Sequence, residues 1–158
     1  MDKNTVAIQA KALHGSGSNC AQAVLCAFSD TVGFDRALAH RLSTCLGAGF
    51  GRKQLVCGAI SGGAMALGAA FGNDSGVDLE AKERSYAMVN RFITQLEHEF
   101  GASDCATLLG VDLETESGRA EVKARSLNIS VCDRIIGRSA ELVAEYLNEA
   151  SSSKGTQQ

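Results

Sequence analysis

The sequence predicts an all-α protein, a single-domain antiparallel helical bundle with a Gly/Ala-rich central helix. Apolar residues recur at spacings of three and four through almost the whole chain, whereas runs that alternate apolar and polar residues are scarce. A chain of 158 residues has the size of one domain. We therefore expect one domain over residues 1 to 150 and a disordered polar tail over residues 151 to 158.

Four helices are expected in the first half, each recognised by an apolar stripe together with a capping residue or a terminating glycine. Their approximate residue ranges are 4 to 13, 20 to 30, 35 to 46 and 57 to 71. The third of these follows Asp35, an N-cap candidate, and turns Leu38 and Leu42 toward the core. A glycine-rich loop is expected between the third and the fourth helix.

The central helix lies in an uncharged run of 18 residues, 55 to 72, of which ten are Gly or Ala. Such residues contribute little transfer free energy, so a buried helix is favoured over a membrane span. Each glycine costs up to ~1 kcal/mol of helix propensity relative to alanine. We expect the pairs Gly58/Gly62 and Gly68/Gly72 to repay this by close helix packing within the chain, which favours a monomer over a homodimer.

The second half is expected to hold a long helix, a short one, a weak one and a final one. Their approximate ranges are 78 to 100, 103 to 109, 117 to 125 and 130 to 150. Gly101 should cap the long helix. If the segment 110 to 129, which contains the weak helix, makes a return pass along the bundle, the final helix starts at the same end as the helices of Cys20, Cys57 and Cys105.

Composition excludes several classes of function. The formal net charge is -3, and there are two tyrosines and no tryptophan for stacking on bases, so nucleic acid is not an expected partner. No basic stretch followed by a hydrophobic run opens the chain, so we expect a cytoplasmic protein. Six cysteines in a reducing compartment are expected to be thiols, metal ligands or a redox couple.

Four cysteines lie at predicted helix starts, namely Cys20, Cys57, Cys105 and Cys132. Alternate helices of an antiparallel bundle begin at the same end, so these four should meet in space. Unpaired N–H groups and the helix dipole at each start should stabilise a thiolate and lower its pKa. The pattern predicts a four-thiolate site.

The glycine-rich loop offers backbone donors to that site. Gly47, Gly49 and Gly51, together with Gly58, are candidate cofactor-binding residues, because their N–H groups could donate to cluster sulfur or thiolate. No strand precedes the loop and it matches no nucleotide-binding fingerprint.

Other candidates are expected to be structural. Cys26 and Cys45 do not lie at helix starts and are interpreted as small buried hydrophobes. His14 and His98 lie near the ends of helices that run toward the cysteines, and both are interpreted as surface residues.

The residues that carry a resemblance are Asn19 to Val24, the Gly47 to Gly51 loop, the Cys57-Gly58-Ala59-x-x-Gly62 element and the later Cys105 and Cys132. From about residue 10 to 147 the chain resembles the redox-active family named for its C...GCAxxG...C...C pattern. The resemblance implies a small redox-active helical protein whose defining cysteines are the four named above. The chain departs from the name in having Val56 where a glycine is indicated.

The chain also resembles the cysteine-bearing region of split-Soret cytochromes, where an iron–sulfur centre is associated with such a pattern. It has no C-x-x-C-H, so covalent haem is excluded. The resulting prediction is electron transfer by an iron–sulfur cluster on the four cysteines, with a separate redox partner protein. The alternatives are a metal-free thiol/disulfide enzyme or sensor and a structural zinc site on the same thiolates; whether the protein is an enzyme stays open.

Overall fold

The computed structural model describes residues 1–154 and confirms the all-α prediction, since these residues form helices and contain no strand. The α-helices are α1 (Lys3–Gly15), α2 (Cys20–Phe28), α3 (Arg36–Ser43), α4 (Gly47–Phe50), α5 (Gly58–Phe71), α6 (Leu79–Phe100), α7 (Cys105–Leu109), α8 (Glu116–Ala124) and α9 (Asp133–Lys154). A 3₁₀ helix, η1 (Thr44–Leu46), follows α3, and a π-helix, η2 (Asn128–Cys132), runs directly into α9.

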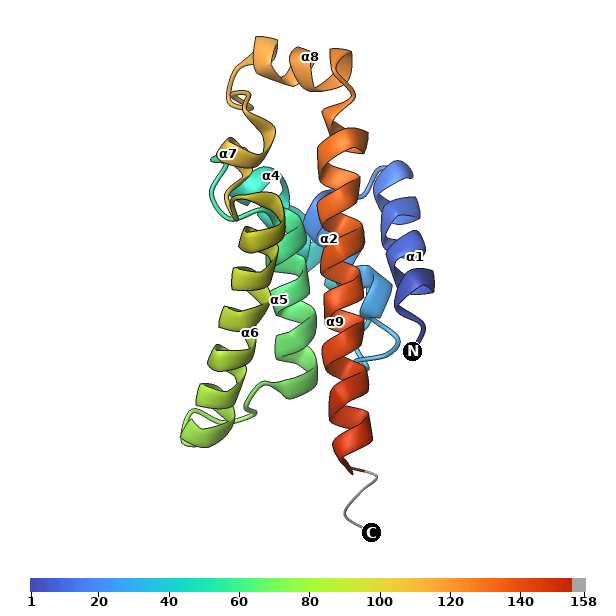
Figure 1. The fold of residues 1–158 in the computed structure, drawn as a ribbon, viewed down its shortest axis with the longest axis vertical. Coiled ribbons are helices and arrows are strands. Elements are labelled where there is room, and N and C mark those ends of the chain that lie inside the picture. The colour runs from blue at the N-terminus through green and yellow to red at the C-terminus, as the bar shows by residue number, and fades with distance from the viewer. Residues whose placement is uncertain (155–158) are drawn as a thin grey trace.

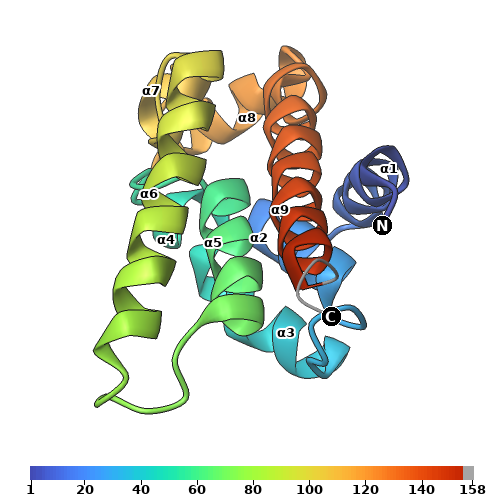
Figure 2. The same ribbon diagram turned by 60° about the horizontal axis from the view of Figure 1, so that its bottom comes forward.

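The long helices form a bundle around α5 (Figures 1 and 2). Helix α5 packs against α2, α6 and α9, and α1 packs against α9 and α2. Helices α5 and α9 begin at the end that is uppermost in Figure 1, α6 runs in the opposite direction, and α8 lies across that end. We call it the cysteine end, because α2, α5, α7 and α9 all start there beside a cysteine.

Glycines in the first half of α5 allow this close packing. A Cβ atom on Gly62 would lie 2.5 Å from the carbonyl oxygen of Ala21, and one on Gly63 would lie 2.5 Å from the Phe92 ring. The predicted close approach is therefore made within the chain, to α2 and α6. The expectation for the second pair is wrong, because a Cβ on Gly68 would meet nothing within 4 Å and one on Gly72 would meet only α5 itself.

The core lies between α2, α5, α6 and α9. Its largest fully buried side chains include Leu25, Phe28, Ile60, Leu67, Phe92, Leu96, Ile135, Ile136 and Leu142. The predicted inward position of Leu38 and Leu42 is wrong, since these side chains are 38% and 51% exposed. Helix α3 lies at the edge of the bundle and buries the small residues Ala39 and Ser43 instead.

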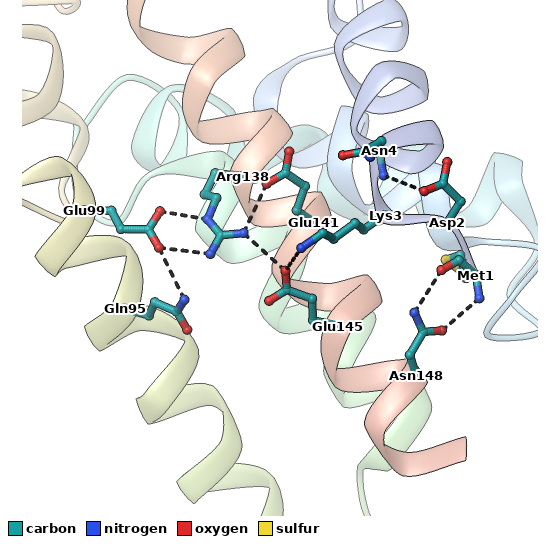
Figure 3. A network of polar contacts seen from close by, with 10 residues as sticks. All are labelled: Met1, Asp2, Lys3, Asn4, Gln95, Glu99, Arg138, Glu141, Glu145 and Asn148. Atoms are coloured by element: carbon teal, nitrogen blue, oxygen red, sulfur yellow. Dashed lines mark hydrogen bonds and ion pairs between the residues drawn. The ribbon is translucent and has the colours of Figure 1, made fainter. Parts of the chain in front are cut away.

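A polar network on the surface joins α9 to α6 and to the N-terminus (Figure 3). The Arg138 guanidinium donates to both carboxylate oxygens of Glu99, at 2.8 and 3.0 Å, and also contacts Glu141. Lys3 pairs with Glu145 at 2.6 Å. These contacts fix α9, which carries the last cysteine at its start, against its neighbours.

Two boundaries differ from expectation. Helix α9 continues to Lys154, so the first part of the predicted polar tail is helical, and residues 155–158 lie outside the described part of the chain. Segment 110 to 129 makes no return pass, because α7 has only five residues and α8 crosses the cysteine end. Among residues 1–154, no helix has the length and apolar character needed to cross a membrane.

Candidate functional site

The four cysteines lie where helical segments begin or change. Cys20 is the first residue of α2, Cys57 is the N-cap of α5 and Cys105 is the first residue of α7. Cys132 differs from the prediction, because it lies at the junction of η2 and α9 rather than at a free helix start. A π-turn of this kind is frequent at functional sites, where it shifts the direction of a side chain.

A short main-chain ladder holds Cys57 beside Cys105. The N–H of Cys57 donates to the carbonyl of Ser103, and the N–H of Cys105 donates to that of Leu55, each at 2.8 Å. Between these bonds, Val56 forms an antiparallel bridge with Asp104. Val56, which stands where the family's sequence pattern indicates a glycine, therefore helps to hold Cys57 beside Cys105.

The Gln54 side chain joins the same ladder to the segment that follows α7, a role that the sequence analysis did not predict. Its buried side chain donates to the carbonyl of Val111 and accepts from the N–H of Leu113, both at 2.8 Å. Its amide also contacts the Cys105 side chain. A lone glutamine beside a glycine-rich loop carries no sequence signal of this role, because its partners lie 57 and 59 positions away.

The glycine-rich loop, which includes the short segment α4, forms a left-handed turn and not a regular right-handed helix. Residues 48 to 52 all have positive φ, and three of them, Ala48, Phe50 and Arg52, are not glycine. A left-handed conformation costs an L-residue roughly 1–2 kcal/mol. Such strain persists only where the surroundings hold it, and it concentrates at functional sites. Here the turn packs against the ladder that positions Cys57 and Cys105.

Three of the four candidate glycines have a packing reason to be glycine. A Cβ on Gly47 would lie 2.5 Å from the Asn19 side chain, which caps α2, and one on Gly49 would lie 2.7 Å from Cα of Gln54. A Cβ on Gly58 would lie 3.1 Å from Cβ of Cys20. The N–H of Gly51 is used within the loop, donating to the Gly47 carbonyl at 2.9 Å. A direct role of these glycines toward a cofactor stays a prediction.

A cavity of about 200 Å³ lies at the cysteine end. It is lined by Cys20, Cys105 and Cys132, by the polar side chains of His14, Asn19 and Asn128, and by Ala48, Leu109, Leu113 and Val122. Cys57 does not line the cavity, but it lies close enough to interact electrostatically with Cys20 and Cys105. The structure thus places three cysteines around a largely apolar space and the fourth, Cys57, close to them.

His14 belongs to this cavity and is not the surface residue expected from the sequence. Its Nδ1 lies 2.6 Å from Oδ1 of Asp133, the residue after Cys132. The carboxylate holds the ring orientation, and Nε2 has no hydrogen-bond partner among residues 1–154. The sequence places His14 near the correct end, but only the fold shows that it faces the thiols.

Burial and mutual contact set the thiol pKa values. Burial raises the pKa of Cys57 to about 11, against the effect of the first N–H groups of α5. It raises the pKa of Cys105 to about 12. A hydrogen bond from the Cys20 thiol to the Cys132 sulfur raises the pKa of Cys20 well above 9.0 and lowers that of Cys132. The expected lowering at every helix start is therefore wrong for three of the four thiols, because desolvation and thiol–thiol contact outweigh the helix end.

The remaining candidates lie apart from the cavity. Cys26 is buried, as predicted, and its Sγ lies 3.9 Å from the carbonyl oxygen of Arg36. Cys45 is exposed, so its expected burial is wrong. His98 is exposed on α6, as expected.

A single-metal site was one sequence alternative. Within residues 1–154, no three side chains of His, Cys, Asp or Glu are grouped closely enough to hold one metal ion. The four thiols share one end of the molecule and one electrostatic environment, but they are not arranged as a closed tetrahedral set around a point.

Fold and site define an all-α protein with four neighbouring cysteines at one end of its bundle, three of which line a pocket. The family model described as "Putative redox-active protein (C_GCAxxG_C_C)" matches residues 18–146, which is most of the chain and includes the four cysteines. The chain belongs to this family. No curated protein and no solved structure matches it significantly.

Proposed function

We propose that this redox-active protein transfers electrons through one iron–sulfur cluster held by Cys20, Cys57, Cys105 and Cys132. The observation that carries the proposal is that Cys20, Cys105 and Cys132 line one largely apolar cavity and that Cys57 lies within electrostatic reach of them. Thiolates are the usual protein ligands of such clusters. A separate redox protein would exchange the electrons, and the cytoplasm is the expected compartment.

The residues present fit a polynuclear centre better than a single ion. Four thiolates bound to one zinc ion each lie about 2.3 Å from it, which requires closer grouping than the described residues have. A cluster places several metal atoms between its ligands and so accepts thiols that lie farther apart. The cavity of about 200 Å³ far exceeds the roughly 10–15 Å³ that one water needs.

The protein's own groups have distinct parts in this proposal. The ladder between Leu55 and Ser103 holds two thiols at a fixed spacing, and the apolar lining limits the access of water. His14, oriented by Asp133, is a polar group positioned beside the sulfurs, where hydrogen bonds tune a reduction potential. When bound, the cluster would supply one-electron chemistry that these residues lack.

Iron and acid-labile sulfide analysis after anaerobic purification tests the proposal. We expect both elements together with visible absorption that bleaches on reduction. Absence of both from anaerobically purified and from reconstituted protein would rule the cluster out. Zinc in a stoichiometric amount, with no iron, would instead support the structural site.

A metal-free dithiol couple is the second candidate, and one observation favours it. Cys20 and Cys132 are in hydrogen-bonding contact, and their pKa values are shifted in opposite directions. In this arrangement the Cys132 thiol ionises more readily and the Cys20 thiol less readily than an isolated thiol. Oxidation of the two thiols would form one S–S bond, break both S–H bonds and pass two electrons to an oxidant such as a disulfide, with release of two protons. Loss of two free thiols on oxidation, reversed by reductant and abolished by Cys132→Ser, would support this couple.

A further inference from the structure

A second cavity lies on the outer face of α8. It has a volume of about 500 Å³ and is lined by Arg52, Glu116, Arg119, Ala120 and Lys123. Helix α8 separates it from the thiol cavity, because Val122 of the same helix lines the inner space. Arg52 comes from the left-handed turn, so two segments far apart in the sequence supply its charged residues.

The cations of this cavity are not neutralised by the protein. The side chains of Arg52 and Lys123 form no ion pair or hydrogen bond with any residue from 1 to 154. Two neighbouring cations differ in this respect: Lys53 pairs with Glu114 at 2.5 Å, and Arg125 pairs with Glu121 at 2.6 Å. Of these four neighbouring cations, the two that line the cavity are therefore the unpaired ones.

Arg119 is fixed in place without losing its charge. Its NH1 group donates to the carbonyl oxygens of Leu113 and Glu114, both at 2.9 Å. Carbonyl groups carry no net charge, and the Nε and NH2 donors stay available. A guanidinium held in this way matches the geometry of an oxyanion and loses little freedom on binding one.

The charge around the cavity selects among anions. Three cations and the carboxylate of Glu116 give a formal charge of +2. A phosphate monoester carries about −1.5 to −2 at neutral pH, whereas a carboxylate carries −1. A broad acidic protein surface is a poorer match, because the neighbouring cations Lys53 and Arg125 are already paired with carboxylates.

We propose that this cavity binds the phosphate group of a small molecule or free phosphate, with Arg52, Arg119 and Lys123 as the binding residues. The site is independent of the cysteines and of any centre that they hold. Glu116 weakens binding, because its carboxylate lies on the same rim.

Calorimetric titration of the purified chain at constant ionic strength tests this site. The ligands are inorganic phosphate, methyl phosphate and acetate, and both phosphates should bind more tightly than acetate. Tighter binding of methyl phosphate than of inorganic phosphate would indicate a phosphorylated small molecule, and the reverse order would indicate free phosphate. Failure of both phosphates to bind would overturn the proposal.

Matched variants make the test specific. Lys123→Gln and Arg52→Gln should each weaken phosphate binding by about fivefold, the effect of losing one exposed charge pair. Lys53→Gln and Arg125→Gln remove the same charge nearby, from cations that are already paired, and should change affinity less than twofold. Glu116→Gln should tighten binding. If Lys53→Gln and Arg125→Gln weakened phosphate binding as much as Lys123→Gln and Arg52→Gln, the site would be overturned. The loss of affinity would then depend only on the net charge of the protein.

Discussion

Cys57 and Cys105 lie 48 positions apart in the sequence, yet two main-chain hydrogen bonds of 2.8 Å tie their backbones to the same short ladder. The bonds use the main-chain N–H groups of both cysteines, so neither thiol takes part in them. The spacing of these two residues therefore depends on the backbone and on Gln54 rather than on a bond between sulfurs. Serine in place of either cysteine should keep the ladder intact.

Serine at Cys20, Cys57, Cys105 or Cys132 should abolish or severely reduce the bound iron and sulfide, because a serine hydroxyl ionises poorly and is a weak ligand. Metal analysis of each anaerobically purified variant measures this. Cys45→Ser is the matched control, because Cys45 is exposed and lies outside the cavity; it should keep the centre and change stability by less than about 0.5 kcal/mol. Loss of the centre in Cys45→Ser and its retention in Cys105→Ser would contradict the ligand assignment.

Gln54→Ala should destabilise the fold at the cysteine end. It leaves the Leu113 N–H and the Val111 carbonyl without their side-chain partner, which should cost about 2 to 4 kcal/mol in the free energy of unfolding. Urea denaturation measures the loss. Gln95→Ala, which removes one exposed hydrogen bond of 3.3 Å, is the control and should cost less than about 0.5 kcal/mol. Equal stability of the two variants would show that Gln54 does not hold the ladder.

Two glycines of α5 should respond to alanine in opposite ways. In Gly63→Ala the new Cβ would lie 2.5 Å from the fully buried Phe92 ring, so the ring or the helices must shift and the melting temperature should fall. In Gly68→Ala the Cβ meets nothing within 4 Å, and the gain in helix propensity should stabilise by up to about 1 kcal/mol. Thermal unfolding of both variants checks the contrast, which a uniform response would contradict.

The ion pair between Glu99 and Arg138 should make stability depend on pH. Hydrogen bonding to the guanidinium lowers the pKa of Glu99 below its ordinary 4.5. The folded state therefore binds fewer protons, so the stabilisation is complete above pH 4.5 and is lost as the pH falls through the lower folded value. Glu99→Gln should reduce stability at pH 7 by less than about 1 kcal/mol, since the pair is partly exposed.

Denaturation of wild type and Glu99→Gln at several pH values measures this difference, which should vanish in strong acid. Glu83→Gln on the same helix is the control, because Glu83 is exposed and has no ion pair with residues 1–154. A difference between wild type and Glu99→Gln that stays constant across the acid range would refute the assignment.

The sequence by itself determined most of the helices and the common end of Cys20, Cys57 and Cys105, whereas the place of Cys132 depends on α8 crossing that end and not on the predicted return pass. Apolar spacing, caps such as Asn19 and glycine stops such as Gly101 are local signals, and a helix forms from local hydrogen bonds, so both are readable along the chain. The order of long helices then fixes which ends coincide. The exposure of Leu38 was not readable, because it depends on α3 lying at the edge of the bundle.

Only the tertiary structure decided how the thiols are held and what surrounds them. The ladder between Cys57 and Cys105, the role of Gln54 and the pairing of His14 with Asp133 join residues at least 46 positions apart. The thiol pKa values also follow from the fold, since burial outweighs the helix starts that the sequence reveals. Local patterns predict where a cysteine lies in a helix, whereas desolvation and contact distance are properties of the packed chain.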